Sequence, residues 1–514
     1  MSIDSSTIGV LVCVCAAIPV CLLARLTYCA HREGRRLRAV VLGLTLIHEI
    51  VLVAYPGWYQ AFAGFTAETE LHITPAQFLS VYMGEALFVI LFCAAIYFGD
   101  RGNRSFTSGQ QSHVESTGFP DRDRLFISAL VIAAAALYIG QFFQPTLDYE
   151  GLAVSYQPEA YTGLLALLSG WGGAFIRWPG LFAAGYALVS ESIPRSIRFL
   201  AGAVLIAEMA YSMIYGTRGG IVWVISVIVL AGYCKSRKLL LAAVAIVGIA
   251  FAPLFSWMHT NMRYVTLAAP AGTLNWQMIP ALVEGAIHHQ VLNSSAIGDT
   301  FIESWAIRAQ GPLNSTYLYR FFDQGDGGFY KPDLGAIVYP VPRVLWPNKP
   351  SAGSTDSSTL NGAIFRVQQA KPDSSGYDMG PVLASGHAYW EGGWAYLYFA
   401  AIVTGWVWSR LLRWAEKSGC EAVSIIVLVF TAALPIDGFF STMTPLFAYI
   451  RLIWTTLLPM LMFIAAVDWW IRRRKLIEAS RSAGLSTNEM SSPASALWNS
   501  TSRPRHRERM DDAR

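Results

Sequence analysis

The sequence predicts an all-α polytopic membrane protein with about eleven transmembrane helices, in a range of about ten to twelve, and one large extracytoplasmic loop. Composition points to this class, because the 514-residue chain is 54% apolar and only 14% charged, unlike an ordinary soluble enzyme. Apolar runs of about 18 residues or more, which cross roughly 30 Å of hydrocarbon as helices, recur along almost the whole chain. Basic residues mark alternate connections between those runs.

The apolar runs define the predicted spans to within several residues at each end. In chain order they are 7–28, 39–62, 76–99, 124–144, 161–189, 197–216, 219–234, 239–257, 385–409, 421–441 and 445–470. The fifth run is too long for one straight span. The region Gly170–Gly173 and the stretch RWPG (Arg177–Gly180) predict a break or a preceding interfacial helix there.

The basic connections predict the orientation, since Lys and Arg near span ends gather on the cytoplasmic side. They are HREGRRLR (31–38), RGNR with DRDR (101–104 and 121–124), PRSIR (194–198), KSRK (235–238), RLLRWAEK (410–417) and RRRK (472–475). The intervening short connections are nearly free of Lys and Arg. The pattern predicts an N-terminus outside, a C-terminus in the cytoplasm and an extracytoplasmic segment at 258–384.

These boundaries divide the chain into four parts. They are an N-terminal bundle of about eight spans at 1–257, the outer loop at 258–384, about three C-terminal spans at 385–470 and a basic, disordered cytoplasmic tail at 471–514. The tail is rich in Ser and Arg and is expected to be solvated. The formal net charge of +4 predicts no nucleic-acid partner, because the basic residues are topology signals and tail rather than one patch.

No metal and no cofactor are predicted. All seven cysteines lie in predicted spans or at their cytoplasmic ends, so disulfides do not hold the outer loop and no thiol chemistry is indicated there. No Cys/His spacing typical of a metal site occurs, and the adjacent His288 and His289 are interpreted as a polar helix face rather than a ligand pair.

The outer loop is far longer than a connector needs, and loops of that size are usually functional. Its stretch YPVPRVLWPNKP (339–350) contains four prolines, which fix φ and bias the preceding residues toward extended backbone. Arg343 and Lys349 are therefore expected to lie on a stiff, irregular path, with Trp346 at the lipid headgroup level. A purely structural role, as a rigid segment that covers the helix ends, would explain the same prolines and cations.

Another cation, Arg218, lies in YGTRGG (215–220) at the outer end of two predicted spans. Glycines allow a ligand to approach the backbone closely, and an Arg can hold phosphate with two hydrogen bonds. A tight turn explains the glycines equally well. It does not explain an Arg at the outer leaflet, against the orientation rule.

Ionisable residues within the predicted spans are expected to pair or to line a cavity, because a charge facing lipid costs at least about 2–3 kcal/mol. They are His48, Glu49, Glu85, Arg177, Glu208, Asp437 and Arg451. Arg451 and Asp437 fit either a structural ion pair or a substrate contact. Glu49 and Glu85 also fit a proton relay, which keeps a transporter open as an alternative.

The outer loop re-enters the membrane through ASGHAYWEGGWAYLY (384–398). His387 and Glu391 are four residues apart, so they share a helical face if the helix has already begun. A His or a carboxylate at the water boundary can act as the general base for a hydroxyl nucleophile. An interfacial His within a Trp and Tyr belt is the alternative interpretation.

The stretch PRVLWPNKP (342–350) resembles the PR-x-LWP-x-KP signature of Wzy-type oligosaccharide repeat-unit polymerases, the bacterial O-antigen and exopolysaccharide polymerases. The layout of roughly residues 200–460, with a large periplasmic loop and an Arg-Gly turn like GTRGG before a span, is also similar. The resemblance implies a GT-C-like glycosyltransferase of the bacterial inner membrane. Its substrate would be an undecaprenyl-diphosphate-linked oligosaccharide, its expected partners a chain-length regulator and a flippase, and no cofactor is implied.

The resemblance also implies roles for single residues. Arg218 and Arg343 would bind the diphosphate with Lys349 and Arg451 in support, because preorganised cations stabilise a leaving diphosphate. His387 or Glu391 would be the catalytic base. Many members carry a Gly-Glu pair at this point, so GHAYWE departs from the pattern.

Two other classes remain open. An O-antigen ligase would share the topology and the cations but would use the lipid A core as acceptor, and the LWPNKP match favours the polymerase. A flippase or secondary transporter would carry internal repeats and broken helices in matching halves. The sequence shows no such repeat, and a carrier would leave the long outer loop unexplained.

Overall fold

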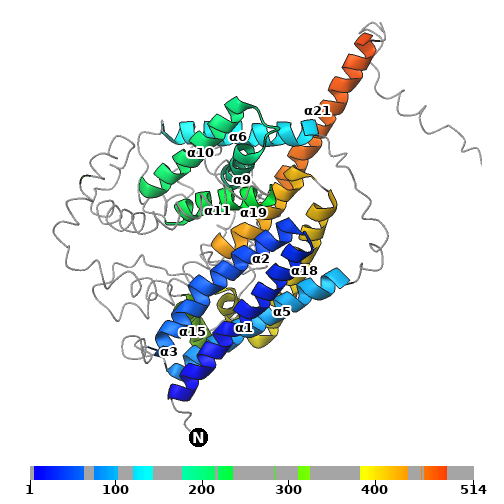
Figure 1. Ribbon diagram of the computed structural model, residues 1–514. Coiled ribbons are helices and arrows are strands. Elements are labelled where there is room, and N and C mark those ends of the chain that lie inside the picture. Colours follow the sequence, from blue (N-terminus) through cyan, green and yellow to red (C-terminus); the bar gives the residue numbers. More distant parts are fainter. Residues whose placement is uncertain are drawn as a thin grey trace, which may run out of the picture. The chain divides into compact units, whose positions relative to one another are not determined.

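The computed structural model describes residues 5–62, 74–101, 120–142, 176–214, 218–235, 284, 311–323, 383–418, 420–437, 453 and 457–482. Every element in these ranges is helical, and none of the described residues lies in a strand (Figure 1). The predicted all-α class is therefore confirmed for this part of the chain.

Four described helices are long and apolar enough to cross a membrane. They are Ser5–Arg32, Arg36–Phe62, Pro75–Asp100 and Gly392–Ser418. Each overlaps a predicted span, and together they make the chain a multi-pass membrane protein. The total of about eleven spans stays a prediction, because the eighth run and parts of others lie outside the described residues.

The chain divides into two compact units, residues 1–461 and 462–514. The second unit contains most of α21 (Leu458–Ser482). This helix continues from the eleventh predicted span through the basic stretch RRRK, and two of its arginines lie over exposed tryptophans, Arg473 over Trp469 and Arg474 over Trp470.

The first unit holds two groups of packed helices (Figure 1). The first group comprises α1 (Ser5–Arg32), α2 (Arg36–His48), the π-helical turn η1 (Glu49–Ala54), α3 (Tyr55–Phe62), α5 (Pro75–Arg101), α15 (Gly311–Asp323) and α18 (Ala384–Ser418). The second comprises α6 (Pro120–Phe142), α9 (Trp178–Val189), α10 (Arg195–Ile214), α11 (Arg218–Cys234) and α19 (Glu421–Asp437). α18 packs along α5, α15 contacts both, and α19 joins the groups through α2 and α18.

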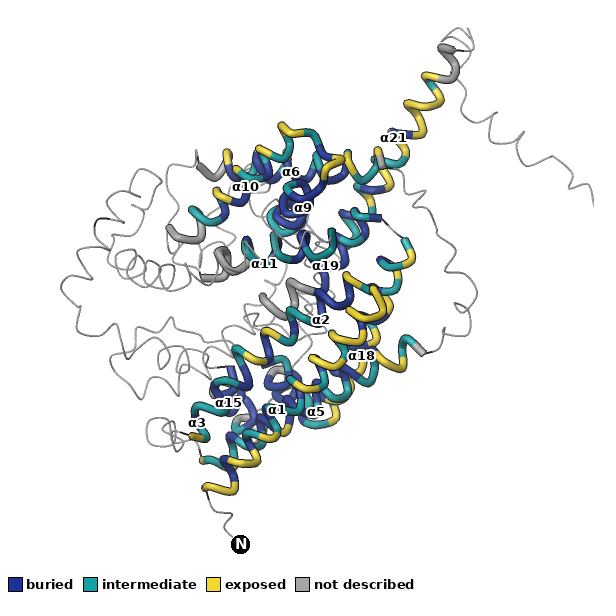
Figure 2. The backbone as a smooth tube through the Cα atoms, viewed as in Figure 1, coloured by how far each residue is buried: buried dark blue, intermediate teal, exposed yellow. Residues whose placement is uncertain are grey.

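Large apolar side chains lie on the outside of these helices as well as inside. Figure 2 shows exposed positions along the helices in yellow and buried ones in dark blue. Tyr82 and Phe182 are fully buried between helices, whereas Phe199 and Ile206 project from α10 with most of their surface exposed. A helix in water would place charged or polar residues on its outer face. Large exposed apolar side chains are therefore consistent with a lipid surrounding.

The second predicted span is one continuous helical path from Arg36 to Phe62, but the turn η1 interrupts its regular α-helix. Pro56 follows this turn and has no N–H, so it cannot make the usual bond to the residue four positions earlier. The Tyr82 hydroxyl of α5 donates to the Val53 carbonyl oxygen at 2.9 Å. π turns are frequent at functional sites, and this one begins at the buried Glu49.

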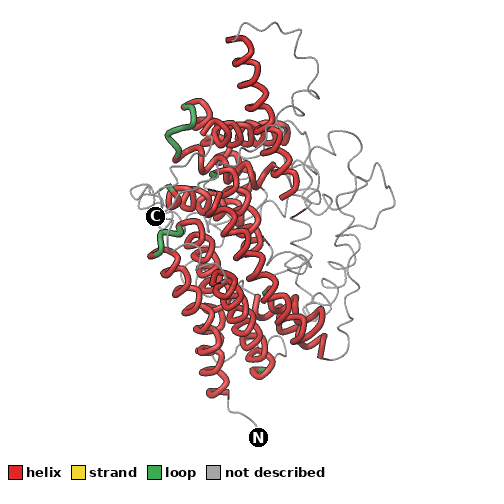
Figure 3. The backbone as a smooth tube through the Cα atoms, turned by 90° about the vertical axis from the view of Figure 1, so that its right-hand side faces the viewer, coloured by secondary structure: helices red, strands yellow, loops and turns green. Residues whose placement is uncertain are grey.

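α18 has a sharp kink that divides it into an opening segment, Ala384–Glu391, and the membrane-crossing part from Gly392. Figure 3 shows the described elements, turned by 90°, as helices joined by short loops. Gly393 has φ of 63° and ψ of −154°, a conformation that residues with a Cβ rarely adopt. A Cβ there would also lie 2.9 Å from the Phe322 ring of α15. Glycine thus permits both the kink and the docking of α15.

Several basic connections meet at one end of the first unit. Arg36 donates to the Cys234 carbonyl oxygen at 3.3 Å, which joins loop 31–38 to the end of α11. Lys235 pairs with Glu421 at the start of α19. Further links join Arg35 and Arg38 to Asp100 and Glu416, and Cys420 to Asp123. These contacts bring together described residues at the connections 31–38, 121–124, 235–238 and 410–417. The common side of all six basic connections, and its identity as the cytoplasmic side, stay predictions.

Replacement of Gly405 by Ala is expected to destabilise the bundle. The added Cβ would overlap the Phe92 carbonyl oxygen and lie 2.8 Å from the Ala95 Cβ of α5. Overpacking of this kind costs about 1–3 kcal/mol. Gly202→Ala in α10 is the control, because its nearest neighbour would be 4.0 Å away. Thermal unfolding in one detergent should show a lower midpoint only for Gly405→Ala; equal midpoints would contradict the close packing of α5 and α18.

Candidate functional site

Two carboxyl groups from different helices meet in the interior of the first helix group. Glu49 of η1 and Glu85 of α5 are each 2% exposed, and a hydrogen bond links their carboxyl groups. The Ser385 hydroxyl, from the opening segment of α18, donates to Glu85 Oε2. We call Glu49, Glu85 and Ser385 the carboxyl cluster. It joins the opening segment of α18 to two helices that come much earlier in the chain.

The carboxyl cluster needs a proton, because two carboxylates without one repel each other and cannot share a hydrogen bond. Isolated charge is also costly at membrane depth. The pair therefore holds at most one negative charge, which the Ser385 hydroxyl helps to solvate. Such a pair is able to bind and release a proton within the bundle.

Aromatic rings lie beside the carboxyl cluster, where α15 docks on α18. Tyr319 of α15 stacks on Tyr389 with ring centroids 3.8 Å apart, and Trp394 meets the Tyr389 ring edge-on at 5.2 Å. The Tyr389 hydroxyl donates to Asp323 Oδ1 at 2.7 Å. Burial, reinforced by the nearby Glu85, raises the pKa of Tyr319 well above its usual range. Its hydroxyl therefore stays neutral at physiological pH.

His387 and Glu391 lie in the opening segment of α18. The helix begins at Ala384, before both residues, so His387 and Glu391 lie about one helical turn apart, as the sequence predicts for a helix that has already begun. Their side chains lie outside the described part of the structure. Whether either acts as a base therefore stays a prediction.

The predicted phosphate-binding cations are mostly outside the described residues. Arg218 is the first residue of α11, and only its backbone is described. Arg343, Lys349 and Arg451 all lie outside the described ranges. The meeting of these four cations at one site therefore stays a prediction.

Arg177 and Glu208, two of the ionisable residues in the predicted spans, form an ion pair that the sequence did not specify. Two hydrogen bonds join them, from Arg177 Nη2 to Glu208 Oε1 at 2.6 Å and from Nε to Oε2 at 3.0 Å. The Tyr138 hydroxyl of α6 also donates to Glu208. The interaction fastens three helices of the second group, and a parallel pair of bonds from Arg is among the strongest side-chain contacts.

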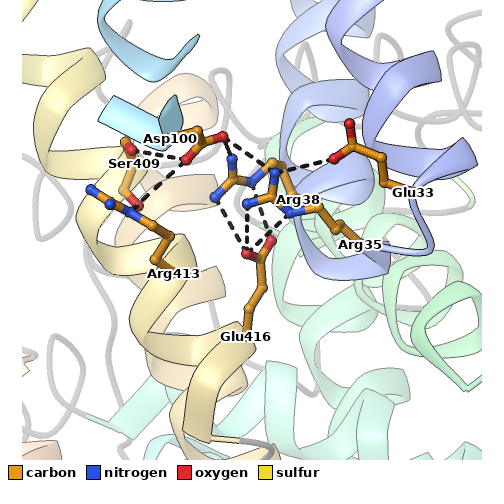
Figure 4. Close-up of polar contacts among 7 residues, drawn as sticks. All are labelled: Glu33, Arg35, Arg38, Asp100, Ser409, Arg413 and Glu416. Carbon is orange, nitrogen blue, oxygen red and sulfur yellow. Dashed lines mark hydrogen bonds and ion pairs between the residues drawn. The ribbon is translucent and has the colours of Figure 1, made fainter. Parts of the chain in front are cut away.

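A network of charges lies where α2, α5 and α18 meet (Figure 4). This arginine network consists of Glu33, Arg35, Arg38, Asp100, Ser409, Arg413 and Glu416. Arg38 is 2% exposed and pairs with Asp100 and, at 3.1 Å, with Glu416. Arg35 reaches the same two carboxylates at 3.3 and 3.0 Å. The network fastens the ends of these helices to one another.

Sequence reasoning singled out Glu49 and Glu85 but missed Ser385, Tyr319 and Tyr389. The four-residue spacing of Ser385 and Tyr389 is a signal that they share a helical face, but it does not show which helix they meet. Among the described residues, no group of three or more His, Cys, Asp or Glu side chains is arranged to hold a metal ion.

Comparisons of the chain with protein-family models, with curated proteins and with solved structures find no match in any of the three. The described residues define an all-helical, multi-pass membrane protein with a buried carboxyl cluster.

Removal of one carboxylate from the arginine network is expected to destabilise the protein strongly. Glu416→Gln leaves the buried Arg38 with one carboxylate instead of two, and Asp100 alone then faces Arg35, Arg38 and Arg413. Removing one partner from a buried charge pair costs up to roughly 3 kcal/mol. Glu478→Gln is the matched control, because its pair with Arg474 is largely exposed and contributes little. Thermal unfolding should separate the variants, and equal midpoints would show that the network contributes no stability.

Proposed function

We propose that the protein is a polymerase that joins undecaprenyl-diphosphate-linked oligosaccharide repeat units on the periplasmic face of the bacterial inner membrane. The bond between the anomeric carbon of one glycan and its lipid diphosphate breaks. A hydroxyl of the acceptor sugar forms the new glycosidic bond and gives its proton to a base, while the lipid diphosphate leaves with the bonding electrons. The expected partner proteins are a flippase that supplies the substrate and a chain-length regulator.

The observation that carries this proposal is the stretch PRVLWPNKP (342–350), placed in a long segment between membrane helices. Its prolines would hold Arg343 and Lys349 in fixed positions. Negative charge develops on the diphosphate as the glycosidic bond breaks, and preorganised guanidinium groups stabilise it. Arg218 and Arg451 would add to this field.

The opening segment of α18 supports the proposed placement of the base. Ser385 binds Glu85, and Tyr389 stacks on Tyr319, so both ends of the segment are fastened to the bundle. His387 lies between them in the chain, and Glu391 follows by one turn. A rigid support of this kind holds a catalytic side chain in a productive geometry.

Reconstitution tests the proposal directly. The purified protein in lipid, given undecaprenyl-diphosphate oligosaccharide of its host, is expected to produce a gel ladder spaced by one repeat unit. Arg343→Ala is expected to abolish the ladder, because the diphosphate loses a cation. Arg195→Ala removes an exposed charge of α10 and should leave the ladder intact. Unextended single units from folded wild-type protein would overturn the proposal, and transfer to added lipid A core would indicate a ligase.

The carboxyl cluster favours a second candidate function, proton-coupled transport of a lipid-linked glycan. A buried pair that shares one proton is typical of proton relays in transporters. The proposed glycosyl transfer assigns its proton to His387 or Glu391 and gives the carboxyl cluster no proton to transfer. The polymerase remains the better supported proposal, because a transporter leaves the long outer segment with its proline-rich stretch unexplained.

Glu85→Gln separates these two functions. The amide keeps the size of the side chain and an oxygen that can accept the Ser385 hydrogen bond, but it cannot release a proton at physiological pH. Repeat-unit polymerisation is expected to continue at a similar rate in this variant. Loss of substrate-driven proton uptake into vesicles, with wild-type uptake present, would instead identify a transporter.

A further inference from the structure

The C-terminal half of α18 has a stripe of exposed side chains on one face. Its members recur at helical spacing and are Phe399, Ile402, Trp406, Arg410 and Trp414. Residues three and four apart share a helical face, and this part of α18 is long and apolar enough to cross a membrane. We infer that lipid covers this stripe. Arg410 lies near the C-terminal end of the stripe, next in the chain to Ser409 of the arginine network.

Arg410 has no carboxylate partner among the described residues. Its guanidinium lies over the Trp406 ring, with 5.3 Å from Cζ to the ring centroid. Trp414 follows one turn later on the same face and is also exposed. Tryptophan and arginine gather at the lipid headgroup level, where an indole has one apolar and one wet side.

Arg413, three residues further on, also has a donor without a hydrogen-bond partner among the described residues. Its Nε donates to the Ser409 carbonyl oxygen at 3.1 Å and lies 3.9 Å from Asp100 Oδ1. Its Nη2 is buried and has no hydrogen-bond partner among the described residues. In Figure 4 its terminal nitrogens point away from Asp100 and Glu416, which Arg35 and Arg38 already occupy.

We propose that Arg410 and Arg413 bind the headgroup phosphate of an anionic phospholipid whose acyl chains lie along the exposed stripe of α18. The phosphate oxygens would accept the free N–H groups and offset two neighbouring positive charges. The apolar stripe residues that precede Arg410, Phe399, Ile402 and Trp406, can contact acyl chains. A soluble phosphate ion has no acyl chains to place there. The occupant is therefore a lipid of the surrounding membrane, and this site is separate from the proposed glycan site.

Native mass spectrometry of the full-length protein, mixed with equal amounts of phosphatidylglycerol and phosphatidylcholine, tests this site. The wild type is expected to retain phosphatidylglycerol preferentially. Arg410→Gln is expected to weaken that preference by about tenfold, the effect of losing a charge-assisted contact. Arg413→Gln should act in the same direction. Arg195→Gln, which removes an exposed charge from α10, should leave the preference unchanged.

Three results would overturn the proposal. One is an unchanged preference for phosphatidylglycerol in a folded Arg410→Gln variant. Arg410 lies outside the arginine network, so this variant still tests the site if Arg413→Gln fails to fold. Another is an equal loss in Arg195→Gln, which would reveal a general surface charge effect. The third is displacement of phosphatidylglycerol by inorganic phosphate, which would identify a soluble anion site.

Discussion

The pairing of buried charges is the constraint on which this helical bundle depends. An unpaired charge among membrane-crossing helices is costly, and the described residues meet this requirement in three ways. Arg38 binds two carboxylates, Arg177 and Glu208 form a double hydrogen bond, and the carboxyl cluster holds a proton and a serine hydroxyl. Each arrangement joins helices that are far apart in the sequence, so electrostatics determines which helices are neighbours.

These contacts also fix α18, which follows the segment predicted to lie outside the membrane. The arginine network holds its C-terminal end, the carboxyl cluster holds its opening segment, and Gly393 allows the change of direction between them. The docking of α15 between α5 and α18 adds stacked aromatic rings at the same place. The opening segment is thereby a rigid part of the bundle, which is the property that a catalytic or binding segment needs.

Much of the fold was predictable, because hydrophobic length and basic connections report on single helices and on their sides of the membrane. The four membrane-crossing helices followed from hydrophobic length, and the contacts among four of the six basic connections agree with their predicted common side. Contacts between residues far apart in the sequence could not be predicted from these patterns. Neither the meeting of Glu85 with Ser385 nor the π turn at Glu49 leaves a local signal, since each depends on which helix lies opposite. The short motif around Arg343 predicts diphosphate binding from residue types alone, and its structure stays a prediction.

We propose that a lipid diphosphate binds to Arg343 and Arg218 beside the opening segment of α18. A cryo-electron microscopy map of the protein in lipid with its lipid-linked oligosaccharide bound would test this placement. We expect diphosphate density in contact with Arg343 and Arg218, with the sugar next to His387 or Glu391. Diphosphate density elsewhere on the protein, with these residues far from it, would contradict the proposed site.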